Sequence, residues 1–582
     1  MFLSMRTRIA ARRATDRARR AARLAVIGCL ASGLTATAAQ VASAQDLPRA
    51  VPGVPMVIPV TDERLLDPEP ESWLMYRRTY DGWGFSPLSQ IDNSNVADLA
   101  PAWTFTTGAN DGVPQSPPIV NGRMMFVTTA EQVIALDAQT GNLVWRYRHP
   151  LPADVRRPHA TNRGVALYGD RVYVGTLDAR VVALEAATGR VVWKRVIANY
   201  RRTYYITMAP LAVNGMVMVG TSGGEHGVRG FVVALDAGSG DEVWRRYTVP
   251  APGEPGAETW SGDSWQTGGG PVWITGNYDP ALGITYWGVG NGGPWMGDAR
   301  PGDNLYTNST IALDAATGAL LNHHQYHWNG SWDWDEANAP LLVDIERGGR
   351  TIPALAHPGR NGYLWLLDRS DGGMRFLEAQ PFVHQNVFTS VDPFTGRPEY
   401  DSARKPGIGK RVEFCPSFAG GRDWRPDAFN PRTGLLYVPA VDNLCSSMEG
   451  RAVEYRPGLP YTGASVNVYR RDGTDHVGEL QAWDLDTGER VWTYELQARA
   501  GSVLATAGDL VFLADSGGVL RAFDALTGEP LWRYAVQGYL VRSVVTSYAV
   551  GGTQYVALQL SPHGGASDAG SMVAAFAIDC QC

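Results

Sequence analysis

Cysteine, long apolar segments and charge are all scarce in this chain of 582 residues, and each scarcity excludes a class of protein. The chain has 5 cysteines and no Cys-x-x-Cys-His motif, so we expect no covalently attached haem c. After residue 44 no apolar run is long enough to span a bilayer, so no transmembrane segment is expected. The formal net charge is −7, which argues against nucleic acid as a partner and suits a basic soluble one.

The first 44 residues have the pattern of an export signal. Residues 1–23 carry eight arginines and one aspartate, and the following segment is apolar or small and ends in Ala42-Ser43-Ala44. This pattern predicts a signal peptide over 1–44, cleaved after Ala44, and hence a periplasmic protein. A twin-arginine route and a lipoprotein cleavage at Cys29 remain open alternatives. Because the leader carries eight arginines and one aspartate, its removal changes the formal charge from −7 to −14.

Four cysteines remain after this cleavage. In an oxidising compartment Cys415 and Cys445 could form a disulfide that bridges one loop region. Cys580 and Cys582 are too close in sequence for an easy mutual bridge, and the sequence gives them no role.

Glycine (66), proline (37) and tryptophan (19) are abundant, which is typical of many short strands and tight turns. An eleven-residue pattern recurs: Ala, apolar, Asp, two variable residues, Thr, Gly, three variable residues, Trp. In each copy we expect a strand to end at the acidic residue, the Thr-Gly pair to form the turn, and the next strand to present the aromatic ring. The clear copies are 135–145, 183–193, 234–244, 482–492 and 522–532, and the degenerate ones are 312–322 and 366–376.

The spacing of these copies predicts the architecture. Most successive copies lie 40 to 54 residues apart, which is the length of a four-stranded propeller blade. A larger gap after Asp368 leaves room for another blade and for a loop insertion at 444–476. A closing blade would be shared between the segment near Trp103 and the C-terminal strands. The sequence therefore predicts an all-β fold, a single eight-bladed β-propeller with tryptophan-docking repeats over residues 45–582.

The motif Trp332-Asp333-Trp334-Asp335 places two carboxylates two residues apart. In an extended segment such residues project from the same face, so Asp333 and Asp335 would share one small volume between aromatic walls. Two like charges so placed raise each other's pKa unless a cation lies between them. Taken alone, the pair is more often a solvated acidic turn.

Three further motifs stand at predicted strand ends. The glycine-rich stretch Gly220–Gly230 has one carboxylate, Glu225, and backbone amides that could receive anionic groups. Trp273 follows a run of glycines, and Asn291 lies in a Gly-Asn-Gly turn. Each also has an ordinary explanation, namely an exposed turn, a blade-core tryptophan and a local backbone cap.

Together these repeats and motifs resemble the pyrroloquinoline quinone (PQQ)-dependent alcohol dehydrogenases of the type without a haem c domain, over about Pro70 to Ala575. The same repeat occurs in outer-membrane-assembly propellers without a cofactor, so the repeat indicates the fold and not the activity. The resemblance implies a metal ion held by Glu225, Asn291 and Asp333, with Asp333 also acting as the catalytic base.

The resemblance also implies a set of cofactor contacts. Trp273 would be the floor on which the quinone stacks, Arg163 and Thr207 would hold a cofactor carboxylate, and Arg360 would act in catalysis beside the reactive quinone oxygens. The full set is Gln115, Arg163, Thr207, Ser222, Gly223, Gly224, Trp273, Arg360, Asp423 and Trp424.

Asp335 bears on the identity of the metal. Calcium-type members of the family usually have a small residue at this position, whereas lanthanide-type members have an aspartate. Three carboxylates, from Glu225, Asp333 and Asp335, suit a trivalent cation better than a divalent one, so a lanthanide is favoured over Ca²⁺. The alternative is that Asp335 turns away and bonds a neighbouring backbone amide.

Some positions depart from the family pattern. Gln115 stands where methanol-type members have a glutamate, and Asp423-Trp424 replaces a pair that usually contains asparagine. Arg157-Pro158-His159 stands where many members have two adjacent cysteines that cover the quinone. These departures leave open what covers the quinone and which alcohol is preferred.

The implied function is that of a periplasmic quinoprotein dehydrogenase. It would oxidise alcohols, primary ones in particular, to aldehydes by hydride transfer to metal-bound PQQ, and pass electrons to a soluble cytochrome c. Two alternatives remain: a non-catalytic scaffold of the outer-membrane-assembly type, and a carbohydrate-active enzyme with Asp333 and Glu336 as acid and base. The sequence leaves a homodimer open.

Overall fold

The computed structural model describes residues 55–563 and 570–578. The predicted leader, Cys29, Cys580 and Cys582 lie outside these residues. Strands dominate the described chain. The helical elements there are α2 (Asp62–Leu66) and short 3-10 turns at Val96–Asp98, Tyr200–Arg202, Gly224–His226, Ala257–Thr259, Ser264–Thr267, Gly297–Ala299, Ser370–Gly372 and Ser402–Arg404. In the same ranges no helix has the length and apolar character that a membrane crossing requires.

Eight sheets of four or more strands make up most of residues 55–563 and 570–578. The first four are β4–β7 (Ile119–Asn121, Met124–Thr128, Gln132–Asp137, Leu143–Arg148), β9–β12 (Ala166–Tyr168, Arg171–Gly175, Arg180–Glu185, Val191–Val196), β13–β16 (Leu211–Val213, Met216–Gly220, Phe231–Asp236, Glu242–Tyr247) and β17–β20 (Asn277–Asp279, Ile284–Val289, Ser309–Asp314, Leu320–Gln325). The next three are β21–β24 (Leu341–Arg347, Arg350–Pro358, Tyr363–Asp368, Arg375–Pro381), β28-β29-β32-β33 (Ala428–Asn430, Leu435–Ala440, Gly478–Asp484, Glu489–Leu496) and β34–β37 (Val503–Thr506, Leu510–Ala514, Val519–Asp524, Pro530–Ala535), with β1 (Phe85–Ser86) pairing β34.

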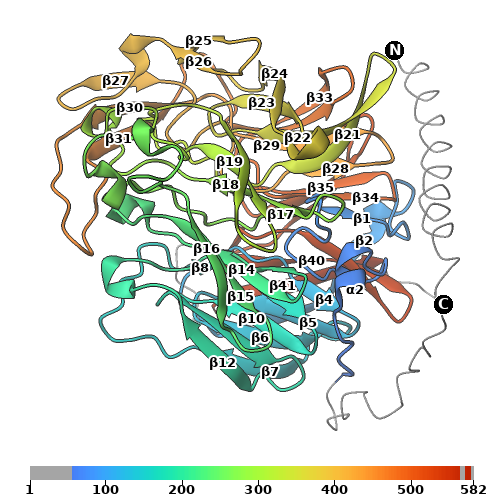
Figure 1. Cartoon of the computed structure of the whole chain (residues 1–582). Coiled ribbons are helices and arrows are strands. Elements are labelled where there is room, and N and C mark those ends of the chain that lie inside the picture. The colour runs from blue at the N-terminus through green and yellow to red at the C-terminus, as the bar shows by residue number, and fades with distance from the viewer. Residues whose placement is uncertain (1–54, 564–569, 579–582) are drawn as a thin grey trace, which may run out of the picture.

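The eighth sheet joins the two ends of the described chain. Strand β2 (Leu99–Thr106) pairs antiparallel with β41 (Met572–Ile578), and Trp103 lies opposite Ala575. Strand β41 pairs with β40 (Thr553–Pro562), which also pairs with β38 (Tyr539–Val541) and β39 (Thr546–Val550). Figure 1 shows the colours following one another around the molecule, with the blue N-terminal strands beside the red C-terminal ones. The all-β prediction and the predicted pairing near Trp103 are both confirmed.

The recurrent tryptophans hold neighbouring sheets together. Trp145 on β7 donates its indole N–H to the carbonyl oxygen of Ala186 in the next sheet, at 2.9 Å. Its ring covers Gly189 of the Thr-Gly turn, where an added Cβ would lie 2.5 Å from the ring. Gly189 has φ +70°, which glycine adopts without strain. The same tryptophan-on-glycine contact is made by Trp103 with Gly141, Trp193 with Gly240, Trp244 with Gly318 and Trp492 with Gly528.

The 444–476 segment contains two strands of its own. Strands β30 (Leu444–Gly450) and β31 (Ala464–Arg470) form a three-stranded sheet with β27 (Arg411–Phe414). A disulfide joins Cys415 to Cys445, as the sequence suggested. The remaining short pairs are β25 (Phe388–Val391) with β26 (Pro398–Tyr400) and β3 (Val113–Pro114) with β8 (Thr161–Asn162).

The docking contact gives a first prediction. Gly189→Ala combines a positive φ with a clash against the Trp145 ring, so we expect it to lower the free energy of unfolding by roughly 2–4 kcal/mol. Gly169→Ala is the matched control, because Gly169 has φ +59° but no atom within 4 Å of an added Cβ. It should cost only the backbone strain, about 1–2 kcal/mol. Scanning calorimetry of both variants tests this, and equal losses of stability would contradict the packing argument.

Candidate functional site

Backbone hydrogen bonds connect segments that follow different strands. The Gly290 N–H donates to Pro271 O and the Gly270 N–H donates to Asn291 O, both at 2.8 Å. A Cβ on Gly224, in the loop after β14, would lie 2.9 Å from the Pro271 ring. The close approach of these chains explains the glycines of the sequence motifs: side chains there would push the three segments apart.

Asp333 and Asp335 converge on Asn291. The Asn291 side-chain amide donates to Asp333 Oδ1 at 3.1 Å, and the Asn291 backbone N–H donates to Asp335 Oδ1. Asp333 has φ +65°, a left-handed conformation that costs a non-glycine residue about 1 kcal/mol or more. Such strain persists only where the surroundings enforce it. The prediction that both carboxylates enter one volume is confirmed.

The alternative prediction for Asp335, that it turns away from the site and bonds a backbone amide, is only half correct. Asp335 does bond a backbone amide, that of Asn291, but it does not leave the site. Its second oxygen accepts from Trp273 Nε1 at 3.1 Å and lies 3.3 Å from Arg360 Nη1. The Asp335 side chain is 5% exposed.

The prediction that the two indoles of the motif flank the carboxylates is wrong. Trp332 and Trp334 stack on each other, with ring centroids 5.0 Å apart and an interplanar angle of 17°. Both are fully buried, and they donate to the carbonyl oxygens of Arg404 and Ser417. The indoles therefore lie in the core, whereas the two aspartates contact Asn291. The tryptophans therefore anchor the segment.

Burial and like charges make these carboxylates difficult to ionise. Burial raises the pKa of Asp333 well above its usual range; Arg360 opposes this shift, and Asp335 and Glu225 add to it. Burial likewise raises the pKa of Asp335 to about 7 and, in part opposed by Arg360, raises the pKa of Glu225. A cation among these three carboxylates would favour their ionised forms.

Arg360 is the cation that faces this cluster. Besides Asp335, it lies near Asp423, with 3.6 Å between Nη2 and Oδ1. Burial alone would lower the pKa of Arg360, but Asp423, Asp335 and Asp333 raise it above its usual value. Arg360 thus stays charged and connects Asp423 to the aspartate segment.

A second chain of polar contacts starts from Arg163. Its Nη1 donates to Thr207 Oγ1 at 2.6 Å, and the Thr207 and Ser222 hydroxyls are 2.9 Å apart. The guanidinium lies over the rings of Trp273 and Trp424, 4.7 and 5.4 Å from their centroids. The predicted cofactor contacts from these five residues therefore lie together.

Gln115 is placed by a pair of parallel strands. In β3 and β8, Pro114 lies opposite Asn162, so the next residues, Gln115 and Arg163, leave the pair at the same end. The predicted neighbours Ser222, Gly223 and Gly224 form the loop after β14, where Gly223 has φ +113°.

The site has donors and acceptors that the described protein atoms leave unsatisfied. Buried atoms without a hydrogen-bond partner include Asn291 Oδ1, Gln115 Oε1 and Arg163 Nε. A neutral amide oxygen among carboxylates matches the oxygen ligands of a hard cation. A buried guanidinium beside a half-buried tryptophan face matches an acidic, planar molecule. The residues present therefore fit both a metal ion and a quinone that carries acidic groups.

Sequence reasoning missed the contacts of Glu336. This side chain is 1% exposed, and it accepts from His357 Nε2 at 2.8 Å and from the backbone N–H groups of Arg360 and Asn361 at 2.9 and 3.1 Å. With its oxygens so engaged, Glu336 does not form an acid–base pair with Asp333. A lone Glu after Asp335 carries no sequence pattern that would have indicated this.

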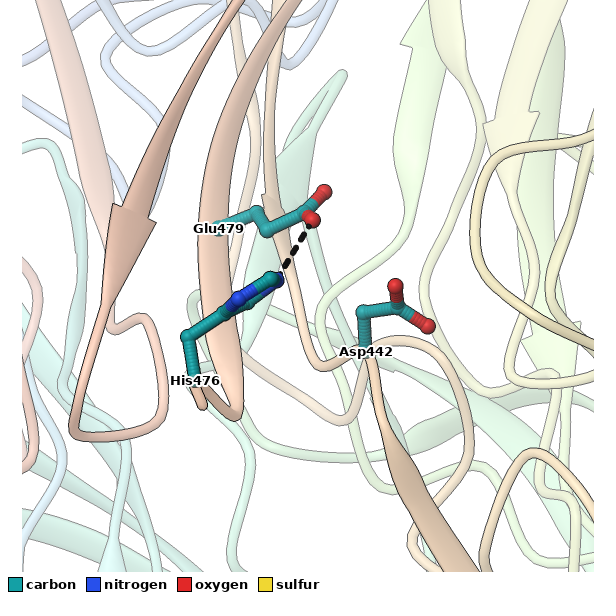
Figure 2. A group of neighbouring side chains, drawn as sticks. All are labelled: Asp442, His476 and Glu479. Atoms are coloured by element: carbon teal, nitrogen blue, oxygen red, sulfur yellow. Dashed lines mark hydrogen bonds and ion pairs between the residues drawn. The ribbon is translucent and has the colours of Figure 1, made fainter. Parts of the chain in front are cut away.

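A separate group of ionisable residues lies at the end of the 444–476 segment. Asp442, His476 and Glu479 have potential ligand atoms within 4.8 Å of one another, as do Asp475, His476 and Glu495. Figure 2 shows His476 bonded to Glu479, at 3.0 Å, with Asp442 beside them. His476 Nδ1 is 3.0 Å from Asp475. The group forms an ion-pair network centred on one imidazole.

Comparisons with known proteins show which families this chain is similar to. Residues 73–376 match the family described as glucose/ethanol/alcohol dehydrogenase, β-propeller domain, and residues 420–579 match the outer membrane protein assembly factor BamB. The quinoprotein alcohol dehydrogenase PedH of Pseudomonas putida is 36% identical, over 78% of this chain and 80% of PedH. The lanthanide-dependent methanol dehydrogenase of Methylacidiphilum fumariolicum is 35% identical, over 77% of each chain.

Solved structures give the same result. A europium-containing methanol dehydrogenase superposes with a TM-score of 0.83 at 32% identity, covering 88% of this chain and all of its own. The chain belongs to the family of PQQ-dependent quinoprotein alcohol dehydrogenases.

The His476 network predicts a pH dependence. Burial alone would lower the pKa of His476, but hydrogen bonds to Asp475 and Glu479 and the charge of Glu495 raise it above its usual value of about 6.5. A raised folded-state pKa stabilises the fold below about pH 6.5, and this contribution is lost as pH rises through the raised value. The melting temperature of the wild type should therefore exceed that of His476→Gln most at pH 6 and less at pH 8. A difference that does not change with pH would contradict the ion-pair network.

Proposed function

We propose that this protein is an exported alcohol dehydrogenase that uses PQQ and one metal ion to oxidise primary alcohols to aldehydes. The observation that carries the proposal is the convergence of Asp333, Asp335 and Asn291 beside Arg360 and the face of Trp273. Family membership and the names of the relatives, which include alcohol and methanol dehydrogenases, support the same activity.

The proposal includes a single eight-bladed propeller domain over residues 45–582, preceded by a signal peptide over 1–44 and located in the periplasm. The eight sheets and the pairing of β2 with β41 support the blade count. The disulfide Cys415–Cys445 supports an oxidising compartment.

When bound, PQQ would supply the two-electron acceptor and the metal ion a Lewis acid. Asp333, held by the Asn291 side-chain amide, would accept the hydroxyl proton of the alcohol in its ionised form, which a cation at the site would favour. Arg360 places a fixed positive charge where negative charge develops. Trp273 offers its partly exposed face to a planar ring, and Arg163 with Thr207 binds an acidic group at its edge. Gln115, Ser222, Gly223, Gly224, Asp423 and Trp424 complete the cofactor contacts.

The metal site we propose consists of Glu225, Asn291, Asp333 and Asp335, with a lanthanide favoured over calcium. The negative charges of Glu225, Asp333 and Asp335 repel one another, and a trivalent ion offsets this repulsion more than a divalent ion. The lanthanide-dependent and europium-containing relatives support this preference.

Electrons would pass to a soluble cytochrome c; the acidic formal charge of the exported chain suits a basic acceptor. The 444–476 segment would shape the approach of the alcohol. Its Tyr461 N–H donates to Glu225 O at 2.6 Å, and an added Cβ on Gly227 would lie 2.8 Å from Tyr455. A homodimer remains compatible with this proposal.

A non-catalytic scaffold is the second candidate, because residues 420–579 match the BamB family. Most of the proposed site, from Arg163 to Arg360, lies in the segment that matches the dehydrogenases. A scaffold would not require its unsatisfied buried polar atoms or its strained Asp333.

The proposed base gives a direct prediction. Asp333→Asn keeps the shape of the side chain but cannot accept the proton, so we expect kcat to fall about 10³-fold. The near-ultraviolet absorption of bound quinone should persist. Asp241→Asn, at an exposed ion pair with Arg195, is the control and should leave kcat unchanged. If Asp333→Asn with full cofactor occupancy turned over at the wild-type rate, the role of Asp333 as the base would be contradicted.

Metal exchange gives a second prediction. Apo-protein reconstituted with PQQ and a light lanthanide should oxidise alcohols in a dye-linked assay, whereas calcium should give little activity. Asp335→Ala should lower the lanthanide-dependent activity at least about tenfold, because it removes one of the three carboxylates. Activity with calcium alone would keep the enzyme class and exclude Asp335 as a ligand. No quinone binding with either ion would favour the scaffold.

A further inference from the structure

Glu336 is a buried carboxylate that directly follows Asp335 in the sequence. The proposed chemistry does not use it. Three donors reach it from residues 357–361, which span the end of β22 and the turn that leads to β23: His357 Nε2 and Arg360 N–H on Oε2, and Asn361 N–H on Oε1. All three distances are 3.1 Å or less. Hydrogen bonds to a buried carboxylate are stronger than those between neutral groups.

The same segment also holds the other end of Arg360. Asp335 Oδ2 lies 3.3 Å from the guanidinium, while Glu336 accepts from the backbone N–H of Arg360. Two consecutive acidic residues thus fix both the backbone and the charged tip of one arginine.

The packing around Glu336 leaves little freedom for a different arrangement. A Cβ on Gly359 would lie 3.0 Å from Glu336 Oε2, so the turn approaches the carboxylate closely. The His357 ring stacks on Tyr326, with centroids 4.2 Å apart and an interplanar angle of 18°. The imidazole is therefore held in the orientation in which its Nε2 meets Glu336.

We propose that Glu336 is a positioning residue for Arg360, tying the 357–361 turn to the aspartate segment so that the guanidinium reaches the reacting centre in one conformation. Its effect on turnover rests on the proposed function, but its effect on the turn does not. Glu336 is not proposed to contact substrate or cofactor.

The test is Glu336→Gln, which keeps the side-chain volume but replaces one acceptor oxygen with a donor. In apo-protein, hydrogen–deuterium exchange of peptides covering 357–363 should be at least about tenfold faster than in wild type, because amide protection reports the local opening that the lost bonds allow. In holo-protein, kcat should fall roughly 10- to 100-fold with KM for the alcohol nearly unchanged, the effect expected of a misplaced catalytic group.

A double-mutant cycle separates positioning from general destabilisation. If Glu336 acts through Arg360, Glu336→Gln should lower kcat much less in an Arg360→Lys background than in wild type. Glu479→Gln is the matched control: Glu479 is buried and bonded to His476 at 3.0 Å (Figure 2). It should lower the melting temperature but leave kcat and exchange at 357–363 unchanged. Should Glu336→Gln not fold, His357→Phe removes one donor and should shift the same readouts less.

The outcomes distinguish this proposal from the proposed function. Unchanged exchange in the 357–363 peptides overturns it, and so does faster exchange with unchanged kcat or with fully additive effects in the cycle. The wild type could also prove neither to bind quinone nor to oxidise alcohols, while Glu336→Gln still exchanges faster. That result would support the contact between Glu336 and the turn and would overturn the proposed function instead.

Discussion

Electrostatic repulsion among buried carboxylates is the constraint on which the rest of the site depends. Burial raises the pKa values of Asp333, Asp335 and Glu225, and neighbouring negative charges add to the shift for Asp333 and Asp335. A protein would not gain stability by gathering them without a cation. Arg360 supplies one positive charge within the described chain, and Asn291 supplies amide donors. The remaining imbalance is what a bound metal ion would satisfy.

Holding these carboxylates close to one another requires a rigid scaffold. Inner strands such as β5 and β6 are buried on both faces, and tryptophans dock on the glycine turns of neighbouring sheets. The segments at Asn291 and Pro271 and the loop that contains Gly224 are then joined by backbone contacts too close for side chains. Rigid sheets with irregular, hydrogen-bonded loops at their ends are how many folds place functional groups. The strained φ of Asp333 is tolerated because Trp332 and Trp334 anchor its segment in the core.

The repeat and the site carry different information about function. The tryptophan-docking repeat is shared by dehydrogenases and assembly factors, and this chain matches both families in different segments. The activity follows from the side chains at the sheet ends, where the dehydrogenase match and the carboxylate cluster coincide. In the proposed metal site Asp335 would bear most on the choice of metal, because it would add a third carboxylate to Glu225 and Asp333.

The sequence by itself determined the strands, the turns and the identity of the candidate site residues. The period of the repeat indicated the sheets, because each Thr-Gly turn and each docking tryptophan is a local signal. Family motifs then indicated Glu225, Asn291 and Asp333. Only the tertiary structure decided that Trp332 and Trp334 stack in the core. The tertiary structure also decided that Asp335 contacts Asn291, Trp273 and Arg360. It likewise decided that Glu336 accepts a hydrogen bond from the backbone N–H of Arg360. Apart from the Trp332–Trp334 stacking, these contacts join separate segments of the chain, and no local pattern specifies which side chain meets which across that distance.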